Sequence, residues 1–328
     1  MPINPAKPFD LEFPVTPAQD RLRLDLFIRA MVPSMSRTRI QRRIRENRVE
    51  VNGAPRPANW RVLDGDAVLL RCNIPEEGED AGKRIPLDIL HEDDDIVVVN
   101  KQPGLVVHPV GRHRHDTLLN ALYWRYKGIL PDDEPVTLAN RLDQCTSGVV
   151  LVAKHAAAKR IVQGDFENRV PGKEYLALCR GKLADDKGEI DLPLGPAGEG
   201  DHCRVAVRHD APGKASLTRY QVAERLPGFT LVRLRPVTGR QHQLRVHMAA
   251  LGHPLAADAR YGGGGRLTLE LPDGRLHILD RCALHAESLT FRHPADGRTM
   301  TVAAALAADM AQTLDALREG AKEVFRLD

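Results

Sequence analysis

The sequence lacks the features that mark a membrane protein or an exported one. No apolar run approaches the roughly 20 residues that a membrane-spanning helix needs. The first five residues, Met-Pro-Ile-Asn-Pro, do not show the basic-then-apolar pattern of a signal peptide. We therefore expect a cytoplasmic protein that does not enter the membrane.

Cysteines are few, and their spacing excludes the common cysteine-based sites. The five cysteines are scattered, odd in number and nowhere arranged as Cys-x-x-Cys. This pattern predicts neither a disulfide framework nor a zinc site.

The chain does contain enough apolar sequence for two domains. Of its 328 residues, 42% are hydrophobic and 28% are charged, which is ordinary for a globular protein. A chain of this length can build one sizeable core and a smaller companion.

Charge is distributed very unevenly along the chain. Residues 21–61 contain eleven arginines, no lysine and three acidic residues, for a net charge of +8. The whole chain carries +3, so the remainder carries −5. A compact basic module attached to a mildly acidic body is typical of a nucleic-acid-binding appendage.

The basic segment has its own pattern of secondary structure. Apolar residues at 22, 24, 27 and 28 predict one helix, and residues 37–46 predict a second, with Ser36 as its expected N-cap. Residues 49–53 read as a strand ending in an Asn-Gly turn, and residues 64–70 read as a turn and a strand. Over residues 21–71 this plan resembles the small RNA-binding domain first described in a ribosomal small-subunit protein. The alternative is a solvated, arginine-rich helix without a ligand. If the resemblance holds, the arginines of the second helix bind RNA: Arg37, Arg39, Arg42, Arg43 and Arg45.

The boundaries of the domains follow from composition. We expect an extended lead-in at residues 1–20, a small α/β RNA-binding domain at 21–73, an acidic linker at 74–85 and a catalytic domain at 86–328. Short strands alternate with helices without regular βαβ spacing, which predicts an α+β fold with a mixed, mainly antiparallel central sheet. Residues 302–317 predict an amphipathic helix that packs against the core.

The most informative stretch is residues 140–148, Asn-Arg-Leu-Asp-Gln-Cys-Thr-Ser-Gly, followed by a buried-looking strand. It places a carboxylate and a guanidinium together at a strand edge. The stretch resembles the catalytic signature His-Arg-Leu-Asp-x-x-Thr-Ser-Gly of the RluA-type RNA pseudouridine synthases. The resemblance implies that Asp143 is the catalytic carboxylate and that Arg141 assists base flipping or holds phosphate. Asn140, Gln144 and Cys145 depart from the residues common in that family.

Two further motifs support the same resemblance. Residues 173–175, Lys-Glu-Tyr, are similar to a Lys-x-Tyr motif in which the tyrosine stacks on the target base, which assigns stacking to Tyr175 and places Lys173 on the same strand face. Residues 238–247 are similar to Thr-Gly-Arg-x-His-Gln-Ile-Arg-x-His. There Arg245 corresponds to the ion partner of the catalytic aspartate, and Arg240 is expected to meet the RNA backbone. The two histidines of this motif make a poor metal site, and we expect them to cap or to hydrogen-bond within the core.

Residues 252–262 and 282–286 resemble two more segments of the family, and Leu284 matches a residue that packs beneath the target base. The resemblance spans about residues 86–294. It implies an isomerase that acts on RNA as a monomer without a cofactor or metal, most readily on large-subunit ribosomal RNA. The alternatives are a tRNA-modifying enzyme and a non-catalytic RNA-binding assembly factor. A hydrolase using Asp143 as nucleophile is disfavoured, because no suitable histidine or second acid stands at a recognisable spacing.

Overall fold

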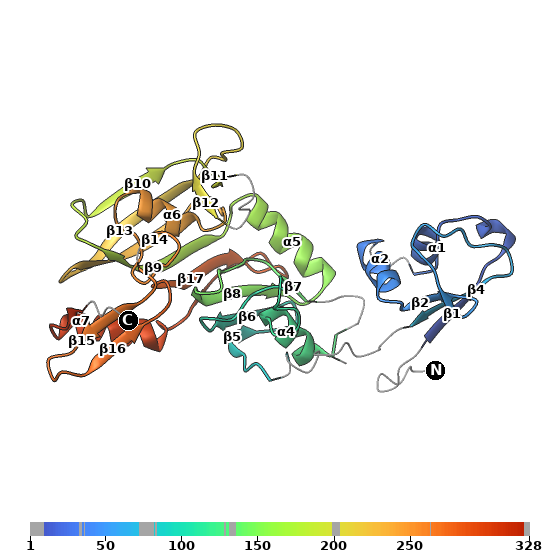
Figure 1. Cartoon of the computed structure of the whole chain (residues 1–328), viewed down its shortest axis with the longest axis horizontal. Coiled ribbons are helices and arrows are strands. Elements are labelled where there is room, and N and C mark those ends of the chain that lie inside the picture. The colour runs from blue at the N-terminus through green and yellow to red at the C-terminus, as the bar shows by residue number, and fades with distance from the viewer. Residues whose placement is uncertain are drawn as a thin grey trace. The chain divides into compact units, whose positions relative to one another are not determined.

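The computed structural model describes residues 10–32, 35, 37–71, 82, 84–127, 129–130, 136–198, 204–262 and 264–324. The chain divides into two compact units, residues 1–79 with 127–133 and residues 80–126 with 134–328 (Figure 1). The expected N-cap Ser36 and most of the expected linker lie outside the described residues.

The first unit combines two helices with a small antiparallel sheet of strand order β1-β4-β2-β3. Its elements are β1 (Asp10–Pro14), the 3-10 helix η1 (Pro17–Gln19), α1 (Leu24–Met31), α2 (Arg37–Arg45), β2 (Val49–Val51), β3 (Ala54–Pro55) and β4 (Ala67–Arg71). Ile40 and Ile44, one helical turn apart, turn the apolar face of α2 into a core that contains Phe27 and Ile28 of α1. Asn47 then adopts the left-handed backbone conformation, with φ 54°, just beyond the end of the helix.

One expectation for this unit needs correction. The segment placed in an extended lead-in contains β1, which pairs antiparallel with β4 over its whole length. Val15, which follows β1, is buried in the same core. Residues from Asp10 onward are therefore part of the small domain, and the Pro-rich composition hid an edge strand.

The second unit is built on a large mixed sheet of order β10-β13-β14-β9-β17-β8-β6-β5, with β18 beside β17 and β7 beside β8. Among the described strands, β17 and β8 form its parallel pair and the other pairings are antiparallel. This confirms the expected fold class. The strands are β5 (Asp88–Glu92), β6 (Ile96–Lys101), β7 (Thr137–Leu138), β8 (Ser147–Ala153), β9 (Gly172–Arg180), β10 (Lys187–Asp191), β13 (Leu217–Leu226), β14 (Phe229–Pro236), β17 (Leu284–Arg292) and β18 (Thr299–Ala303).

Helices and two small sheets complete this unit. They are α4 (Leu118–Tyr126), α5 (Ala156–Glu167), α6 (Gln243–Ala250), α7 (Ala308–Arg318), the pair β11 (Leu194–Pro196) and β12 (Val205–Val207), and the sheet of β15 (Leu267–Glu270), β16 (Leu276–Leu279) and β19 (Lys322–Glu323). Helix α5 packs against β8 and β17. No helix within the described residues is long and apolar enough to cross a membrane.

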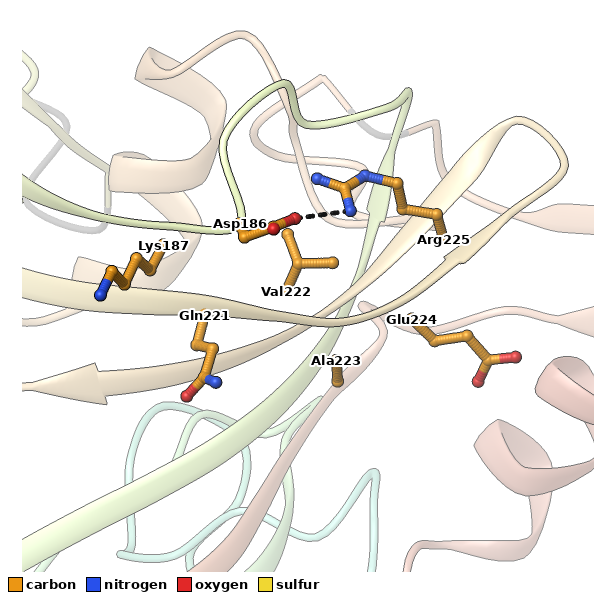
Figure 2. A pocket seen from close by; sticks show the side chains of 7 residues that line it. All are labelled: Asp186, Lys187, Gln221, Val222, Ala223, Glu224 and Arg225. Atoms are coloured by element: carbon orange, nitrogen blue, oxygen red, sulfur yellow. Dashed lines mark ion pairs between the residues drawn. The ribbon is translucent and has the colours of Figure 1, made fainter.

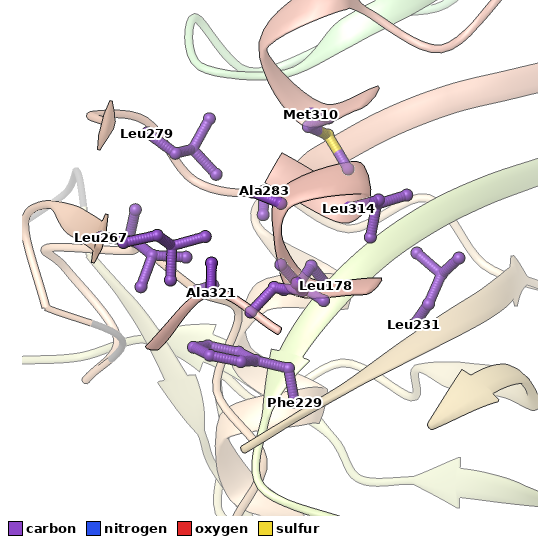
Figure 3. Packing of buried hydrophobic residues seen from close by; sticks show 14 residues of the cluster. Leu178, Phe229, Leu231, Leu267, Leu279, Ala283, Met310, Leu314 and Ala321 are labelled. Atoms are coloured by element: carbon purple, nitrogen blue, oxygen red, sulfur yellow. The ribbon is translucent and has the colours of Figure 1, made fainter. Parts of the chain in front are cut away.

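The C-terminal helix lies over one apolar core of the unit. Met310 and Leu314 of α7 pack with Leu178, Phe229 and the strand residue Leu267 (Figure 3). The helix begins at Ala308, six residues later than the sequence pattern indicated. The preceding residues form β18, because pairing with β17 satisfies their backbone hydrogen bonds at the sheet.

Candidate active site

The Thr-Ser-Gly turn of the motif lies where β8 meets β17. Gly148 has φ +112°, and a Cβ added to it would lie 2.1 Å from the carbonyl oxygen of Ala286. Only glycine permits this backbone conformation and this approach of the two strands. Ser147 adds a buried hydrogen bond between its Oγ and His285 Nδ1, 3.0 Å apart. The turn therefore anchors the motif to the centre of the sheet.

Asn140, the first residue of the motif, holds the other side of the same turn. Its Oδ1 accepts a hydrogen bond from the Leu151 amide at 2.8 Å, and its Nδ2 donates to the Val149 carbonyl at 3.2 Å. Asparagine in place of the family's histidine thus binds the backbone of β8. Its role here is to fix the approach to Asp143.

Asp143 and Arg245 meet although they lie 102 residues apart in the sequence. Arg245 Nη1 donates to Asp143 Oδ2 at 2.9 Å. Its Nε and Nη2 bind the two carboxylate oxygens of Asp258 at 2.7 and 2.8 Å. The Asp258 side chain is fully buried, whereas the Asp143 side chain remains 26% exposed. One guanidinium therefore connects a buried anchor to a carboxylate that solvent and substrate can reach.

The charge of Arg245 is secured by its surroundings. Burial works to lower its pKa, but the hydrogen bonds and charge of Asp258, together with the charge of Asp143, raise that pKa above its ordinary value. The cation thus persists throughout the physiological range and fixes one oxygen of Asp143.

His242 and Tyr261 form a second group beside Asp143. His242 Nδ1 and the Tyr261 hydroxyl are 2.7 Å apart, and His242 Nε2 lies 3.8 Å from Asp143 Oδ2. Tyr261 also lies under Arg245, with the guanidinium carbon 5.0 Å from its ring centre. Burial lowers the pKa of His242, against the opposing charge of Asp143. Sequence reasoning had assigned this histidine no part in the site.

His247, the other histidine of that motif, is fully buried. Its Nδ1 contacts Thr218 Oγ1 at 2.9 Å, and its Nε2 contacts the Leu192 carbonyl at 3.0 Å. It serves as a hydrogen-bonded core residue, which agrees with the expectation from the sequence.

Lys101 is a buried cation next to the motif. Its Nζ donates to the carbonyl oxygens of Gln102, Leu105 and Gln144, at 2.9, 2.8 and 3.2 Å. Burial and the charge of Arg281 lower the pKa of Lys101 to about 7, although the charge of Asp143 opposes this. The sequence showed a lysine at the end of a buried strand, but it gave no sign that the ammonium supports the Asp143 turn.

Arg281 supports the same turn from the opposite side. Its Nη1 donates to the carbonyl oxygens of Cys145, Cys282 and Leu284, at 3.0, 3.2 and 3.1 Å. Its remaining nitrogens bind Asp309 at the start of α7. No signal in the sequence distinguished this arginine from the others.

Tyr175 and Leu284 belong to the same apolar cluster, as expected for the two faces of a base pocket. Antiparallel pairing of β9 and β17 sets Tyr175 opposite Ala286 and Ala177 opposite Leu284. Burial, and to a lesser extent the charge of Asp143, raise the pKa of Tyr175. A phenol in this position stays protonated, which favours stacking over a role as general base.

The three other residues expected to meet RNA lie around this group. Arg141 is exposed, and its charge, after burial, lowers the pKa of His108. Arg240 is exposed in the loop before α6. Lys173 is half-buried, and its Nζ lies 3.7 Å from the position that a Cβ on Gly239 would occupy, which brings it beside the same loop.

The arginines of α2 in the first unit divide into two groups. Arg42 and Arg45 are exposed, and Arg37 is half-exposed while it binds the buried carboxylate of Asp25 at 3.1 Å. Arg43 Nη1 donates instead to the carbonyl oxygen of Arg71 at the end of β4, at 2.9 Å. Arg39 lies in the same helix, but its side chain lies outside the described residues.

The absence of a disulfide, expected from the cysteine spacing, is wrong. Cys145 and Cys282 are bonded, with their Cα atoms 5.8 Å apart. Cys179 is free and buried, and Cys72 and Cys203 lie outside the described residues. The sequence separation of 137 residues explains the miss, because spacing rules detect only cysteines that are near each other along the chain.

Two other features of the second unit contain none of these residues. A hollow of about 410 Å³ at the end of β13 is lined by charged side chains, including the ion pair between Asp186 and Arg225 (Figure 2). Asp93, Asp95 and His293 come close enough to hold a metal ion. Both oxygens of Asp93, however, already accept hydrogen bonds from backbone amides and histidines. This trio is accounted for by the turn that it closes.

Comparisons with known proteins agree with this geometry. The family model described as RNA pseudouridylate synthase matches residues 95–250. A human protein, RNA pseudouridylate synthase domain containing 1, superposes with a TM-score of 0.53 at 30% identity, over 75% of this chain and 98% of that one.

Full-length relatives narrow the assignment. The ribosomal large subunit pseudouridine synthase D of Yersinia pestis is 36% identical over 322 residues, which cover 97% of this chain and 98% of that protein. An uncharacterized RNA pseudouridine synthase of Bacillus subtilis (strain 168) is also 36% identical, over 90% of this chain and 94% of that protein. The chain therefore belongs to the RluA-type family of RNA pseudouridine synthases, which are isomerases.

Proposed function

We propose that this protein converts specific uridines of large-subunit ribosomal RNA to pseudouridine, with Asp143 as the catalytic carboxylate. The relatives named as large-subunit enzymes match nearly the full length of both chains, and this supports the ribosomal substrate. The Asp143–Arg245–Asp258 network is the observation that supports the catalytic role.

The reaction itself explains why such a network suits it. The bond between N1 of the base and C1′ of the ribose breaks, the base turns, and C5 bonds to C1′, while C5 loses a proton and N1 gains one. Atoms and electrons balance within the substrate, so the proposal includes no cofactor. A carboxylate must act at the sugar, either by attacking C1′ or by supporting removal of the C2′ proton. Arg245 keeps one oxygen of Asp143 bound and leaves the other for the ribose.

The target uridine must also leave its stack, which costs a few kcal/mol. In our proposal Tyr175 stacks on the flipped base, Leu284 packs beneath it, and Arg141 fills the space that it leaves or holds its phosphate. Arg240 and Lys173 meet the RNA backbone beside this pocket. These groups all come from one unit of one chain, so a monomer is the proposed working form.

The first unit is proposed to supply RNA affinity. The second unit and the rest of the chain outside residues 21–61 carry a net negative charge, so bulk attraction to RNA must come from the arginine-rich segment. Arg37, Arg39, Arg42 and Arg45 are its proposed phosphate contacts, and Arg43 contributes to the same field from a position tied to β4. Activity on ribosomal RNA would place the protein in the cytoplasm.

The test is to map pseudouridines in total RNA from cells with the wild-type gene, a deletion, or Asp143→Asn. We expect the same discrete sites in large-subunit ribosomal RNA to be lost in both altered strains. Loss of sites in tRNA instead would assign the enzyme to tRNA, the second candidate substrate. If no site depends on Asp143, the catalytic assignment fails, and a non-catalytic role in ribosome assembly takes its place.

A further inference from the structure

Cys145 and Cys282 connect two segments of the candidate active site. Cys145 lies two residues after Asp143, and Cys282 lies two residues before Leu284. Their Cα separation of 5.8 Å is within the range of about 4.4–6.8 Å that a disulfide spans. The bond thus joins the turn that carries the catalytic carboxylate to the strand that carries the floor of the base pocket.

Arg281 holds these two segments together independently of the sulfur atoms. Its Nη1 bonds to the carbonyl oxygens of Cys145 and Leu284, and Asp309 fixes the rest of the guanidinium. When the cysteines are reduced, they therefore stay adjacent. A high effective concentration of one thiol at the other favours closure of the bond by exchange, because little chain freedom remains to be lost.

The two sulfur-bearing residues differ in access. Cys145 is half-buried, whereas Cys282 is 3% exposed. A small disulfide or thiol from solution therefore reaches the bond at Cys145. The guanidinium bound to the Cys145 carbonyl also gives this turn the cationic surroundings that favour a thiolate.

We propose that Cys145 and Cys282 form a reversible disulfide that controls how firmly the Asp143 turn is held. The oxidant is a low-molecular-weight disulfide, RSSR. The Cys145 thiolate attacks one sulfur of RSSR and releases RS⁻, which leaves a mixed disulfide on Cys145. The Cys282 thiolate then attacks the Cys145 sulfur and releases the second RS⁻. The two thiol protons leave with these groups as two RSH, and excess RSH reverses both steps.

The crosslink adds to ties that already hold the turn. Lys101 and the Gly104 amide bind the Gln144 carbonyl, and Arg281 binds the Cys145 carbonyl. Reduction removes the covalent tie, and the sulfur atoms then move apart to non-bonded separation. Because small displacements of a reacting group are costly, we expect reduction to lower turnover about three- to tenfold while KM changes little. The thermal midpoint also falls, since the bond closes a loop of 137 residues.

The experiment uses the full chain with Cys72→Ser and Cys203→Ser, so that Cys179 is the remaining third thiol. The protein is equilibrated in graded mixtures of reduced and oxidised glutathione, quenched, denatured and alkylated, and the alkyl groups are counted by mass. We expect one alkylated thiol in oxidising mixtures and three in reducing ones, with parallel changes in thermal midpoint and turnover. Cys145→Ser and Cys282→Ser are the matched controls. Each should give two alkylated thiols and the lower thermal midpoint in every mixture.

Three alkylated thiols in oxidised glutathione alone would overturn the disulfide. Equal turnover of the crosslinked and reduced forms would overturn its control of the Asp143 turn. The thiol count does not depend on any RNA, so it is separate from the outcome for the ribosomal substrate. Turnover is measured on the RNA that pseudouridine mapping identifies.

Discussion

Arginine serves opposite purposes in the two units of this protein. In the first unit, Arg37 and Arg42 of α2 have side chains 50% and 56% exposed. In the second unit, Arg245 and Arg281 are 9% and 8% exposed and bind several acceptors each. An exposed cation attracts a polyanion from solution and is screened by salt, whereas a buried one holds particular atoms in place. The two sets should therefore fail in different ways when they are changed.

The largest expected effect is on chemistry. Asp143→Asn keeps the shape of the side chain and removes the carboxylate that is proposed to act at the sugar. We expect single-turnover conversion of substrate RNA to fall by roughly 10⁴-fold. Affinity for that RNA, measured by filter binding, should change little, because the first unit is untouched. Retention of more than a tenth of wild-type turnover would remove Asp143 from the catalytic role.

A change to Arg245 tests positioning and stability together. Arg245→Met leaves the fully buried Asp258 carboxylate without its cation, and we expect the free energy of unfolding to fall by about 3–5 kcal/mol. Denaturant titration measures this loss. The matched control is Arg240→Met, an exposed arginine of the same motif, which should change stability by less than about 0.5 kcal/mol. Equal losses in the two variants would mean that the buried ion pair does not support the fold.

Gly148 links the catalytic motif to the sheet. Gly148→Ala combines a strained φ of +112° with a clash against the Ala286 carbonyl, and we expect a loss of about 3 kcal/mol or more. Gly228 has φ +73° and nothing within 4 Å of an added Cβ, so Gly228→Ala isolates the backbone strain at about 1 kcal/mol. Thermal or denaturant unfolding of the pair separates the two contributions. If both variants lose the same stability, the close approach of β8 and β17 is not what requires glycine.

The same glycine shows how far sequence reasoning reached. The motif identified residues 140–148 and Arg245, and the strand pattern predicted the mixed sheet, because both are written in short stretches of sequence. The partners of these residues could not be found that way. The reason for Gly148 lies at Ala286, and the support for Asp143 comes from Lys101 and Arg281, all distant along the chain.

Local composition also misled where tertiary pairing decided the structure. The Pro-rich start suggested a lead-in, yet Asp10–Pro14 pairs with β4. Apolar periodicity extended the last helix backward over residues that pair with β17. In both cases an available sheet edge, which no sequence window contains, determined the outcome.

Lys101 predicts a pH dependence within the second unit. Its pKa falls from the ordinary lysine value to about 7 in the folded protein, so the unfolded chain binds the extra proton between pH 7 and 10. Stability contributed by this site therefore rises with pH across that window. We expect the stability difference between wild type and Lys101→Met to grow by about 1 kcal/mol per pH unit above pH 7. Denaturant titrations at pH 7, 8 and 9 measure it, with exposed Lys159→Met as the baseline. A difference that stays constant with pH would show that the lysine is protonated equally in both states.

The smallest effect on the fold, and the complement of Asp143→Asn, is expected for the exposed arginines of α2. In Arg42→Ala/Arg45→Ala the unfolding free energy should stay within about 0.5 kcal/mol of wild type, and turnover at saturating RNA should be unchanged. Each lost phosphate contact releases fewer counterions, so the slope of log affinity against log salt should fall by about 1.5 to 2. The control is Arg219→Ala/Arg298→Ala, two exposed arginines of the second unit that are each paired with an acid, and it should leave the slope unchanged. If both pairs lower the slope alike, RNA attraction is spread over the whole protein, and the contrast between an RNA-binding unit and a catalytic unit disappears.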